Sequence, residues 1–318
     1  MIYTSENNWY SWGYGSDLKF KRQYGSDKLY TCYSKFSKPI LSFKKELVNA
    51  AASTLEHYPN IRPTILFSGG LDSELVLRSY TKIGANPKVC IIRYENDYNI
   101  YDVSYAVTIC NLLGVDYSII DFNLKKFYEN DAEKISELAQ IDRPRALPQC
   151  KFVDLVDGLP ILGSSDLTGV RTNEDYSIKG TWLIRDHEYD IGWSKYLCET
   201  NRQGIAEWFK WSPGLVLSFT ELKWFRKIIN DKYYGKLGFN STKIAGYREA
   251  YPDLLARKKQ TGFEKTDLLI NEFEVFLQKK YNGLPFRQYV DRTVRQLREE
   301  ILENQNDNNY QNTDQTKY

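Results

Sequence analysis

The chain has 318 residues, about twice the usual length of one domain, which favours a full-sized enzyme domain with accessory elements. Hydrophobic residues make up 42% of the chain, charged residues make up 26%, and the formal net charge is +2. This composition is typical of a soluble globular protein and excludes disordered, collagen-like and coiled-coil chains. Because the charges nearly balance, stable binding to nucleic acid is not favoured, although a local basic groove stays open as an alternative.

The five cysteines are widely separated and never spaced as Cys-x-x-Cys, so the sequence predicts reduced thiols rather than a disulfide framework or a zinc ribbon. Residues 1–15 lack the basic and apolar regions of a secretory signal, and no run of 18 apolar residues occurs. We therefore expect no membrane association and a cytoplasmic location. The frequent Tyr, Lys and Asn residues are typical of an AT-rich genome, and for a viral source the location would be the cytoplasm of a bacterial host.

Residues 1–40 are predicted to form a small N-terminal β cap. Between residues 9 and 38 the chain is rich in Tyr, Lys and Gly, and Leu29–Tyr33 has the alternation of an antiparallel strand. A helix is expected next, over Leu41–Tyr58, because apolar residues recur there at helical spacing. Pro59 then ends that helix.

Strands and helices alternate in the following region. The expected strands are Pro63–Phe67, Lys88–Ile92, Asp116–Phe122 and Leu159–Leu162, with helices beginning at Leu71 and spanning Asp102–Leu113. Such alternation predicts right-handed crossovers and hence an α/β fold, with a parallel sheet of about five strands that is covered by helices on both faces. Ligands of open α/β sheets bind at the carboxyl ends of the strands.

The alternation is lost after about residue 177. Residues 177–225 form a Trp-rich insert whose aromatic side chains are expected to be mainly packing residues, although a role in a substrate pocket or a subunit interface stays open. Within it, the break at Ser212 and Pro213 is expected to precede a helix. The tryptophans concerned are Trp182, Trp193, Trp208, Trp211 and Trp224.

Residues 266–302 are predicted to be C-terminal helices. The first is expected to present one apolar face, and the last is expected to dock its apolar stripe on the core of this chain. The two sets are Leu268, Leu269, Phe273, Phe276 and Leu277, and Val290, Val294, Leu297 and Ile301. The tail, residues 303–318, is dominated by Asn, Gln and Asp and is predicted to be disordered.

The strongest motif is Ser68-Gly69-Gly70-Leu71-Asp72-Ser73, which lies between a predicted strand and a predicted helix. Adjacent glycines permit a sharp turn and a close backbone approach to a ligand, while serine hydroxyls and the amides of a helix start can donate to phosphate oxygens. Asp72 would repel phosphate but fits such a site if it holds Mg²⁺. The alternative is an ordinary strand-to-helix turn in which Asp72 and Ser73 cap the helix.

This motif resembles the signature of the PP-loop ATP pyrophosphatases, a superfamily with an adenine nucleotide α-hydrolase-like fold that includes asparagine, GMP and NAD synthetases. The resemblance implies that residues 41–265 form the ATP-binding synthetase domain, that ATP and Mg²⁺ are the cofactors, and that Phe67–Ser73 binds the β and γ phosphates. A substrate oxygen would then attack the α phosphorus and release pyrophosphate. No Gly-x-x-x-x-Gly-Lys segment indicates a Walker-type site.

A second stretch, Leu162–Gly169, is similar to the Gly-x-Gly-x-Asp-Glu-x-x-Gly segment of asparagine synthetases. The similarity implies that Gly163 and Ser164 lie beside pyrophosphate and that Asp166 joins Asp72 as a ligand of Mg²⁺. Leu167 replaces the glutamate of the family.

A third stretch, Arg257–Phe263, resembles the lysine-containing segment near the end of the same synthetase domain. The resemblance implies that Lys259 is a catalytic cation that screens pyrophosphate, with Arg257 and Lys258 as rivals for that role. Ile92 and Arg93, at the end of the second strand, are expected near the adenosine.

Together these features predict an ATP-dependent, amidotransferase-like ligase similar to asparagine synthetase. It would adenylate an oxygen of a small-molecule substrate, expected to be a carboxylate, and then transfer a nitrogen nucleophile with release of AMP. Because the sequence begins Met1-Ile2 and has only about 60 residues before the loop, we expect no glutaminase domain, and nitrogen would come from ammonia, an amine substrate or a separate amidotransferase subunit.

Two alternatives stay open. One is a nucleobase- or tRNA-modifying PP-loop enzyme of the thiolation, lysidine or deazapurine type, in which Cys150 and Cys198 could form a reactive pair. The other is a non-catalytic nucleotide-binding module, which the missing glutamate at Leu167 keeps open. The sequence does not identify the substrate, and homo-oligomerisation is also left open.

Overall fold

The computed structural model describes residues 3–4, 9–163, 169–171, 182–223, 244–255, 257 and 265–302. Its central feature is a sheet of four parallel strands in the order β6-β5-β4-β7. The strands are β4 (Pro63–Leu66), β5 (Lys88–Tyr94), β6 (Tyr117–Phe122) and β7 (Leu159–Leu162). The predicted parallel α/β sheet is therefore confirmed, with four strands rather than about five in the described part of the chain.

Helices cover both faces of this sheet, as predicted. On one face, Ile65 of β4 packs in a core shared with α1 (Phe43–His57), α2 (Leu71–Lys82) and α3 (Ile100–Leu113). On the other face, the next residue, Leu66, packs with α4 (Leu124–Asn130), α5 (Ala132–Ala139) and α6 (Pro148–Asp154). Neighbouring residues of a strand point to opposite faces, so two separate cores follow from one short apolar strand.

The predicted boundaries in this half lie close to the observed ones. The helix expected to begin at Asp102 begins at Ile100, and the strand expected to end at Ile92 ends at Tyr94. Gly114 ends α3 in the left-handed conformation, with φ of 64°, where glycine is favoured as a helix terminator. Short 3₁₀ turns complete the connections at Glu95–Asp97, Pro144–Ala146 and Trp208–Lys210.

A second sheet, antiparallel in the order β10-β9-β8, was not predicted. It consists of β8 (Gly169–Arg171), β9 (Trp182–His187) and β10 (Tyr289–Thr293). The expectation that Val290 belongs to the last helix is wrong, because Val290 pairs with Asp186 of β9. Helix α12 (Val294–Ile301) begins only after Thr293, whose side chain and that of Gln296 form a capping box.

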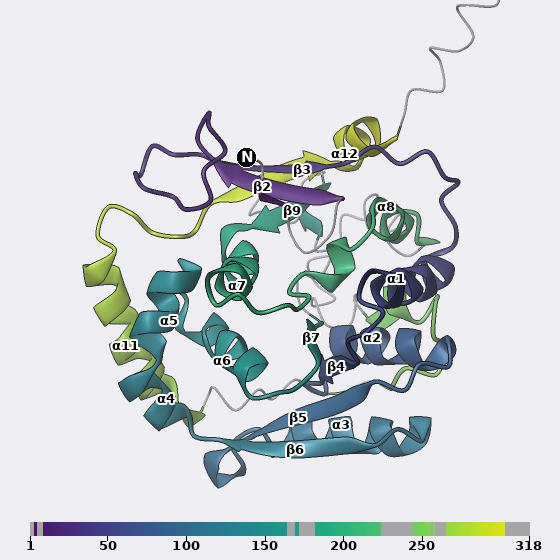
Figure 1. The fold of residues 1–318 in the computed structure, drawn as a ribbon, viewed down its shortest axis with the longest axis horizontal. Coiled ribbons are helices and arrows are strands. Elements are labelled where there is room, and N and C mark those ends of the chain that lie inside the picture. Colours follow the sequence, from purple (N-terminus) through teal and green to yellow (C-terminus); the bar gives the residue numbers. More distant parts are fainter. Residues whose placement is uncertain are drawn as a thin grey trace, which may run out of the picture.

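The N-terminal segment forms a third sheet, and its predicted β character is confirmed. Strands β1 (Tyr3–Thr4), β2 (Tyr10–Tyr14) and β3 (Leu29–Tyr33) are antiparallel in that order. Figure 1 shows β2 and β3 beside β9 and α12, and β3 contacts both β10 and α12. The cap therefore packs on the second sheet.

The Trp-rich insert contains α7 (Glu188–Glu199) and α8 (Pro213–Thr220). Trp193, Trp208 and Trp211 are buried, which confirms the packing role expected for them. Ser212 caps α8 by accepting a hydrogen bond from the Leu215 amide at 3.1 Å, which confirms the predicted break and helix. The side chains of Trp182 and Trp224 lie outside the described part of the structure.

The buried face of helix α11 (Asp267–Lys280) agrees only in part with the predicted one. Ile270 and Leu277 are buried, whereas Leu268 is 76% exposed and Phe276 is also exposed. The predicted face was too wide on one side and omitted Ile270, and the residues of α11 that meet the core of α4 to α6 are Leu269, Ile270, Phe273 and Leu277.

Helix α12 buries Leu297 and Ile301 completely, which confirms that its stripe docks on the core of this chain. No helix in the described ranges combines the length and the apolar character that crossing a bilayer requires. The predicted disordered tail, residues 303–318, lies outside the described residues.

Candidate nucleotide-binding site

Residues 67–73, here called the glycine loop, lie where the strand order of the parallel sheet reverses. Strand β4 pairs with β5 on one side and with β7 on the other, so the chain passes from β4 to β5 and β6 on one side and then crosses back to β7 on the other side. In open α/β sheets this switch point, at the carboxyl ends of the strands, is where ligands bind. The glycine loop follows β4 directly and therefore occupies that position.

The end of β7 contacts the glycine loop. A Cβ atom added to Gly163 would lie 2.6 Å from the Cα of Ser73, which is closer than real Cβ contacts come. Only glycine permits this approach. The structure thus brings Gly163 together with the motif 90 residues earlier.

Gly69 occupies a conformation that requires glycine. Its φ is +75°, and a Cβ atom there would collide with the backbone carbonyl oxygen of Asp102 on α3. The hydroxyl of Ser68 accepts a hydrogen bond from the Gly70 amide at 3.2 Å and lies 3.1 Å from the Ser73 hydroxyl, which donates to the Gly70 carbonyl. The turn is therefore fixed by its own residues and by α3.

The loop exposes some of its groups and buries others. Phe67 and Ser73 are buried, Leu71 and Asp72 are half-buried, and Ser68 is exposed. The first helical hydrogen bond of α2 runs from the Glu74 amide to the Gly70 carbonyl at 3.1 Å. The backbone amides before Glu74 therefore take no part in the hydrogen bonds within the helix. Amides at the positive end of a helix dipole, next to serine hydroxyls, suit a phosphate group.

Asp72, the predicted magnesium ligand, accepts a hydrogen bond from the hydroxyl of Tyr247 at 2.6 Å. Tyr247 is only 1% exposed, and its ring stacks on Phe43 and on Phe209, with centroids 6.1 and 6.4 Å away. Sequence reasoning missed Tyr247, because no motif marks it and it lies 175 residues from its partner.

Arg257, one of the rivals for the cationic role, contacts the glycine loop. Its guanidinium donates to the Gly69 carbonyl and to the carboxylate of Glu74, and it lies over the ring of Tyr105. Glu74 is fully buried and also accepts from Arg78 at 2.7 Å. Arg257 therefore fixes the loop backbone, and sequence reasoning missed Glu74 as its partner. Lys258 and Lys259 lie outside the described residues.

Ile92 and Arg93 lie on β5, the strand next to β4. The Ile92 side chain is half-buried against the core formed with α4 to α6. Arg93 forms a two-pronged ion pair with Asp121 of β6, at 2.6 and 3.0 Å, and this hydrogen bonding lowers the pKa of Asp121. Because β6 lies on the far side of β5 from β4, the Arg93 guanidinium is not brought to the glycine loop.

The two other predicted site residues near β7, Ser164 and Asp166, lie outside the described residues. Within the described ranges no group of three or more His, Cys, Asp or Glu side chains could hold a metal ion. Magnesium commonly uses only one or two protein carboxylates and completes its octahedron with water and phosphate oxygens. Asp72, a half-buried carboxylate beside the glycine loop, fits that donor set.

All five cysteines are free thiols, as predicted. Cys90, Cys110 and Cys150 are buried, whereas Cys198 is exposed. Burial raises the pKa of the Cys150 thiol well above its ordinary value, so it is poorly suited to act as a nucleophile. The structure thus gives no support to a reactive pair of Cys150 and Cys198.

No protein-family model matches the chain, and no curated protein matches it. Among solved structures, the chain is similar to NMN synthetase from Francisella tularensis, with 12% sequence identity and a TM-score of 0.32. The match covers 76% of this chain and 94% of that chain. Since a TM-score of 0.32 is too low to support an inference of function, the geometry of the glycine loop is the observation from which function is inferred.

Proposed function

We propose that this chain is an ATP-dependent enzyme that activates an oxygen of its substrate by adenylation and releases pyrophosphate. The observation that supports the proposal is the glycine loop at the switch point of the parallel sheet. There, Gly69 and Gly163 allow close backbone packing, while Ser68 and the start of α2 present hydrogen-bond donors. A loop of this kind beside the Asp72 carboxylate suits a nucleotide phosphate with its cation.

In the proposed site, the amides of residues 68–73 and the hydroxyls of Ser68 and Ser73 bind the β and γ phosphates. Asp72 holds Mg²⁺, with Asp166 proposed as a second ligand and Ser164 and Lys259 proposed beside pyrophosphate. Bound magnesium supplies positive charge that neutralises the phosphate oxygens and orients them. Ile92 remains a proposed neighbour of adenosine, whereas Arg93 is engaged by Asp121.

The proposed reaction forms a bond from a substrate oxygen to the α phosphorus and breaks the bond from that phosphorus to the bridging oxygen. Pyrophosphate leaves with the electron pair. Because the developing charge lies on phosphate oxygens, the protein contributes positioning and charge neutralisation more than proton transfer. A nitrogen nucleophile would then displace AMP, as in the asparagine synthetases that the loop resembles, with ammonia, an amine substrate or a separate subunit as the donor.

The test is pyrophosphate release from MgATP against a panel of amino acids, small carboxylates, deazapurine acids and bulk tRNA. Asp72→Asn is compared with Asp157→Asn as a matched control. The Asp157 side chain is 95% exposed and precedes the amino end of β7, whereas the glycine loop lies at the carboxyl ends of the strands. Release with one substrate class that is lost in Asp72→Asn and kept in Asp157→Asn would support the enzyme. Binding of ATP without pyrophosphate release from any candidate would favour the non-catalytic nucleotide-binding module.

A further inference from the structure

We infer that Arg257 is a positioning residue of the proposed nucleotide site, which holds the Gly69–Gly70 peptide in the orientation that suits the β and γ phosphates. The inference rests on the proposed function, because that function assigns these phosphates to the glycine loop. The role differs from the one that the resemblance to asparagine synthetases left open for Arg257, which was to screen pyrophosphate directly.

The Arg257 side chain joins three parts of the fold. Its guanidinium donates to the Gly69 carbonyl of the glycine loop and to the Glu74 carboxylate in the first turn of α2, and it lies 5.5 Å from the centroid of the Tyr105 ring on α3. Only 6% of the Arg257 side chain is exposed, and the Glu74 side chain is fully buried. A guanidinium enclosed in this way holds the protein around it and is poorly placed to meet an incoming phosphate.

The Gly69–Gly70 peptide has two orientations open to it. A peptide turns over when ψ of the residue before it and φ of the residue after it change together, and a glycine in the second position permits the positive φ that results. In this structure φ of Gly70 is −75°, and both ends of the peptide are held. The carbonyl accepts from Arg257, and the amide donates to the Ser68 hydroxyl at 3.2 Å. These contacts select one of the two orientations.

The selected orientation determines what the Ser68 hydroxyl can donate to. Because its oxygen accepts from the Gly70 amide, its single proton is directed to another acceptor, such as the Ser73 hydroxyl at 3.1 Å or, in the proposed complex, a phosphate oxygen. In the turned-over peptide, the Gly69 carbonyl oxygen would take the place of that amide and the proton would bond to it instead. Arg257 therefore acts on phosphate binding through the peptide and Ser68.

Arg257→Lys tests the inference, because lysine keeps the positive charge but replaces the fork of N–H donors by a single ammonium. We expect the ammonium to stay with the Glu74 carboxylate and to leave the Gly69 carbonyl. The measured quantity is the dissociation constant of α,β-methylene-ATP, an analogue that does not release pyrophosphate, at saturating Mg²⁺. It should rise about tenfold, because the apparent affinity falls with the fraction of loops in the binding orientation.

Arg78→Lys is the matched control. Arg78 also pairs with the buried Glu74 carboxylate, at 2.7 Å, but its second partner is Asp253, at 2.8 Å. Arg78→Lys should bind the analogue like the wild type, and its thermal midpoint should be close to that of Arg257→Lys. AMP, which has neither a β nor a γ phosphate, should bind equally well to the wild type and to both variants.

Three results would overturn the inference. Wild-type affinity of Arg257→Lys for the analogue would show that positive charge alone is sufficient. Equal losses in Arg257→Lys and Arg78→Lys, or equal losses for the analogue and AMP, would indicate a general disturbance of α2. A thermal midpoint of Arg257→Lys far below that of Arg78→Lys would show that Arg257 serves stability rather than the orientation of one peptide.

Ser68→Ala provides a second test of the route through Ser68. Since Ser68→Ala and Arg257→Lys remove the same donor to phosphate, the double variant should bind the analogue about as weakly as the weaker of the two single variants. Losses that multiply in the double variant would contradict an action through Ser68 and overturn the inference.

Failure of the proposed function gives a different result. If the wild type does not bind α,β-methylene-ATP in the presence of Mg²⁺, the proposed function falls and the inference falls with it. If the wild type binds the analogue but releases no pyrophosphate from MgATP with any substrate, only the reaction is lost. If the wild type does both and Arg257→Lys binds like it, the function stands and the inference alone is wrong.

Discussion

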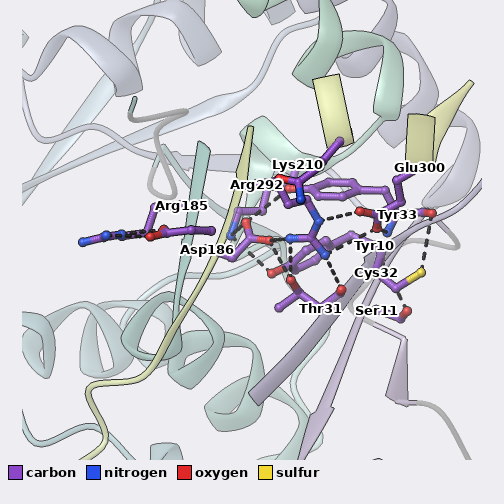
Figure 2. A network of polar contacts seen from close by, with 12 residues as sticks. Tyr10, Ser11, Thr31, Cys32, Tyr33, Arg185, Asp186, Lys210, Arg292 and Glu300 are labelled. Atoms are coloured by element: carbon purple, nitrogen blue, oxygen red, sulfur yellow. Dashed lines mark hydrogen bonds and ion pairs between the residues drawn. The ribbon is translucent and has the colours of Figure 1, made fainter. Parts of the chain in front are cut away.

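Two regions of this molecule gather charged and polar side chains, and they differ in how those groups are satisfied. In the glycine loop, Ser68 is exposed and Asp72 is half-buried beside the start of α2. Beneath the N-terminal sheet lies a buried charge cluster, defined here as Asp186, Lys210 and Arg292 with their hydroxyl and carboxylate neighbours (Figure 2). The glycine loop has an exposed hydroxyl that a ligand can reach, whereas the charged groups of the buried cluster are paired with one another.

Within the buried charge cluster, four side chains surround the Asp186 carboxylate. It accepts from Thr31 at 2.8 Å, from Tyr33 at 3.2 Å and from Arg292 at 2.9 Å, and it pairs with Lys210 at 3.0 Å. Burial by itself would raise the pKa of Asp186, but the two cations outweigh burial and hold it below its ordinary value. Because its oxygens are already hydrogen-bonded or ion-paired to four side chains, we assign the Asp186 carboxylate a structural role.

The cluster also supports the glycine loop indirectly. Glu207, whose carboxylate pairs with Lys210 at 3.1 Å, lies opposite Gly163 in an isolated β-bridge at the end of β7. Gly163 in turn packs on Ser73. The comparison therefore teaches that charged residues alone do not mark a site in this fold, and the proposed site depends instead on hydrogen-bond donors at the carboxyl end of a parallel strand.

The largest expected effect concerns the stability of the buried charge cluster. Asp186→Asn leaves Lys210 and Arg292 without their shared counter-charge, and removal of one partner of a buried ion pair costs about 3–5 kcal/mol in the free energy of unfolding. Denaturant titration would measure it. Asp291→Asn, which disrupts the more exposed pair with Arg185, is the control and should cost about 1 kcal/mol or less. Equal effects of the two substitutions would contradict the structural role assigned to the cluster.

Asp72→Asn is expected to show the opposite result, a loss of activity without a comparable loss of stability. Loss of the carboxylate should lower the rate of pyrophosphate release by about 100-fold or more, which corresponds to about 2.7 kcal/mol, while leaving the free energy of unfolding nearly unchanged. Steady-state kinetics and denaturant titration on the same samples measure both quantities. A fall in stability comparable with that of Asp186→Asn would place Asp72 among the structural residues.

Gly69→Ala should disturb the loop backbone. The substitution combines a positive φ with a collision against the Asp102 carbonyl, so we expect a loss of about 2–3 kcal/mol in the free energy of unfolding together with weaker nucleotide binding. Gly84→Ala is a matched control, because Gly84 also has a positive φ, +71°, but has open space around it. It should cost only about 1 kcal/mol. If both variants lose the same stability, the close contact with α3 is not a constraint.

The smallest expected effect is a pH dependence of the free energy of unfolding, in which two buried lysines differ. Burial lowers the pKa of Lys195 to about 7, whereas Lys210 keeps its charge because Asp186 and Glu207 outweigh burial and raise its pKa. The unfolded chain holds the Lys195 proton up to about pH 10.4, so it binds more protons than the folded protein between pH 7 and that value. The free energy of unfolding should therefore rise with pH above 7.

The contribution of Lys195 to this rise is at most about 1.4 kcal/mol per pH unit, and Lys195→Met should remove it. Denaturant titration between pH 7 and 9 measures the slope. Among the described residues, the Lys195 Nζ atom lies at hydrogen-bond distance from the Tyr14 hydroxyl, at 2.6 Å, and from the Gln140 side-chain oxygen, at 2.9 Å, and the nearby Glu188 carboxylate offsets burial only in part. A pH slope that is the same in the wild type and in Lys195→Met would show that this lysine stays charged in the fold.

Features encoded locally could be predicted from the sequence. The Pro63–Leu66 strand, the Gly69-Gly70 turn and the helix from Leu71 follow one another in the chain, so short-range patterns were sufficient. The same holds for α3, which ends at Gly114. The position of the glycine turn at the carboxyl ends of the strands then followed from the general rule that ligand-binding loops of parallel α/β folds lie there.

Features that depend on distant partners could not be predicted. Tyr247 meets Asp72 across 175 residues, and Arg257 meets Gly69 across 188. Strand β10 forms only because β9, about 100 residues earlier, offers it an edge, and on local pattern alone Val290 reads as helical. Pairing energy between distant segments thus outweighed local propensity at these positions.

The most direct test of the central claim is the identity of the products formed from ATP when the protein is incubated with the substrate found in the panel. Attack at the α phosphorus predicts AMP and pyrophosphate in equal amounts, in the wild type and in Asp157→Asn but not in Asp72→Asn. Formation of ADP and inorganic phosphate would contradict the account, because it would place the reaction at the γ phosphate rather than next to the adenosine.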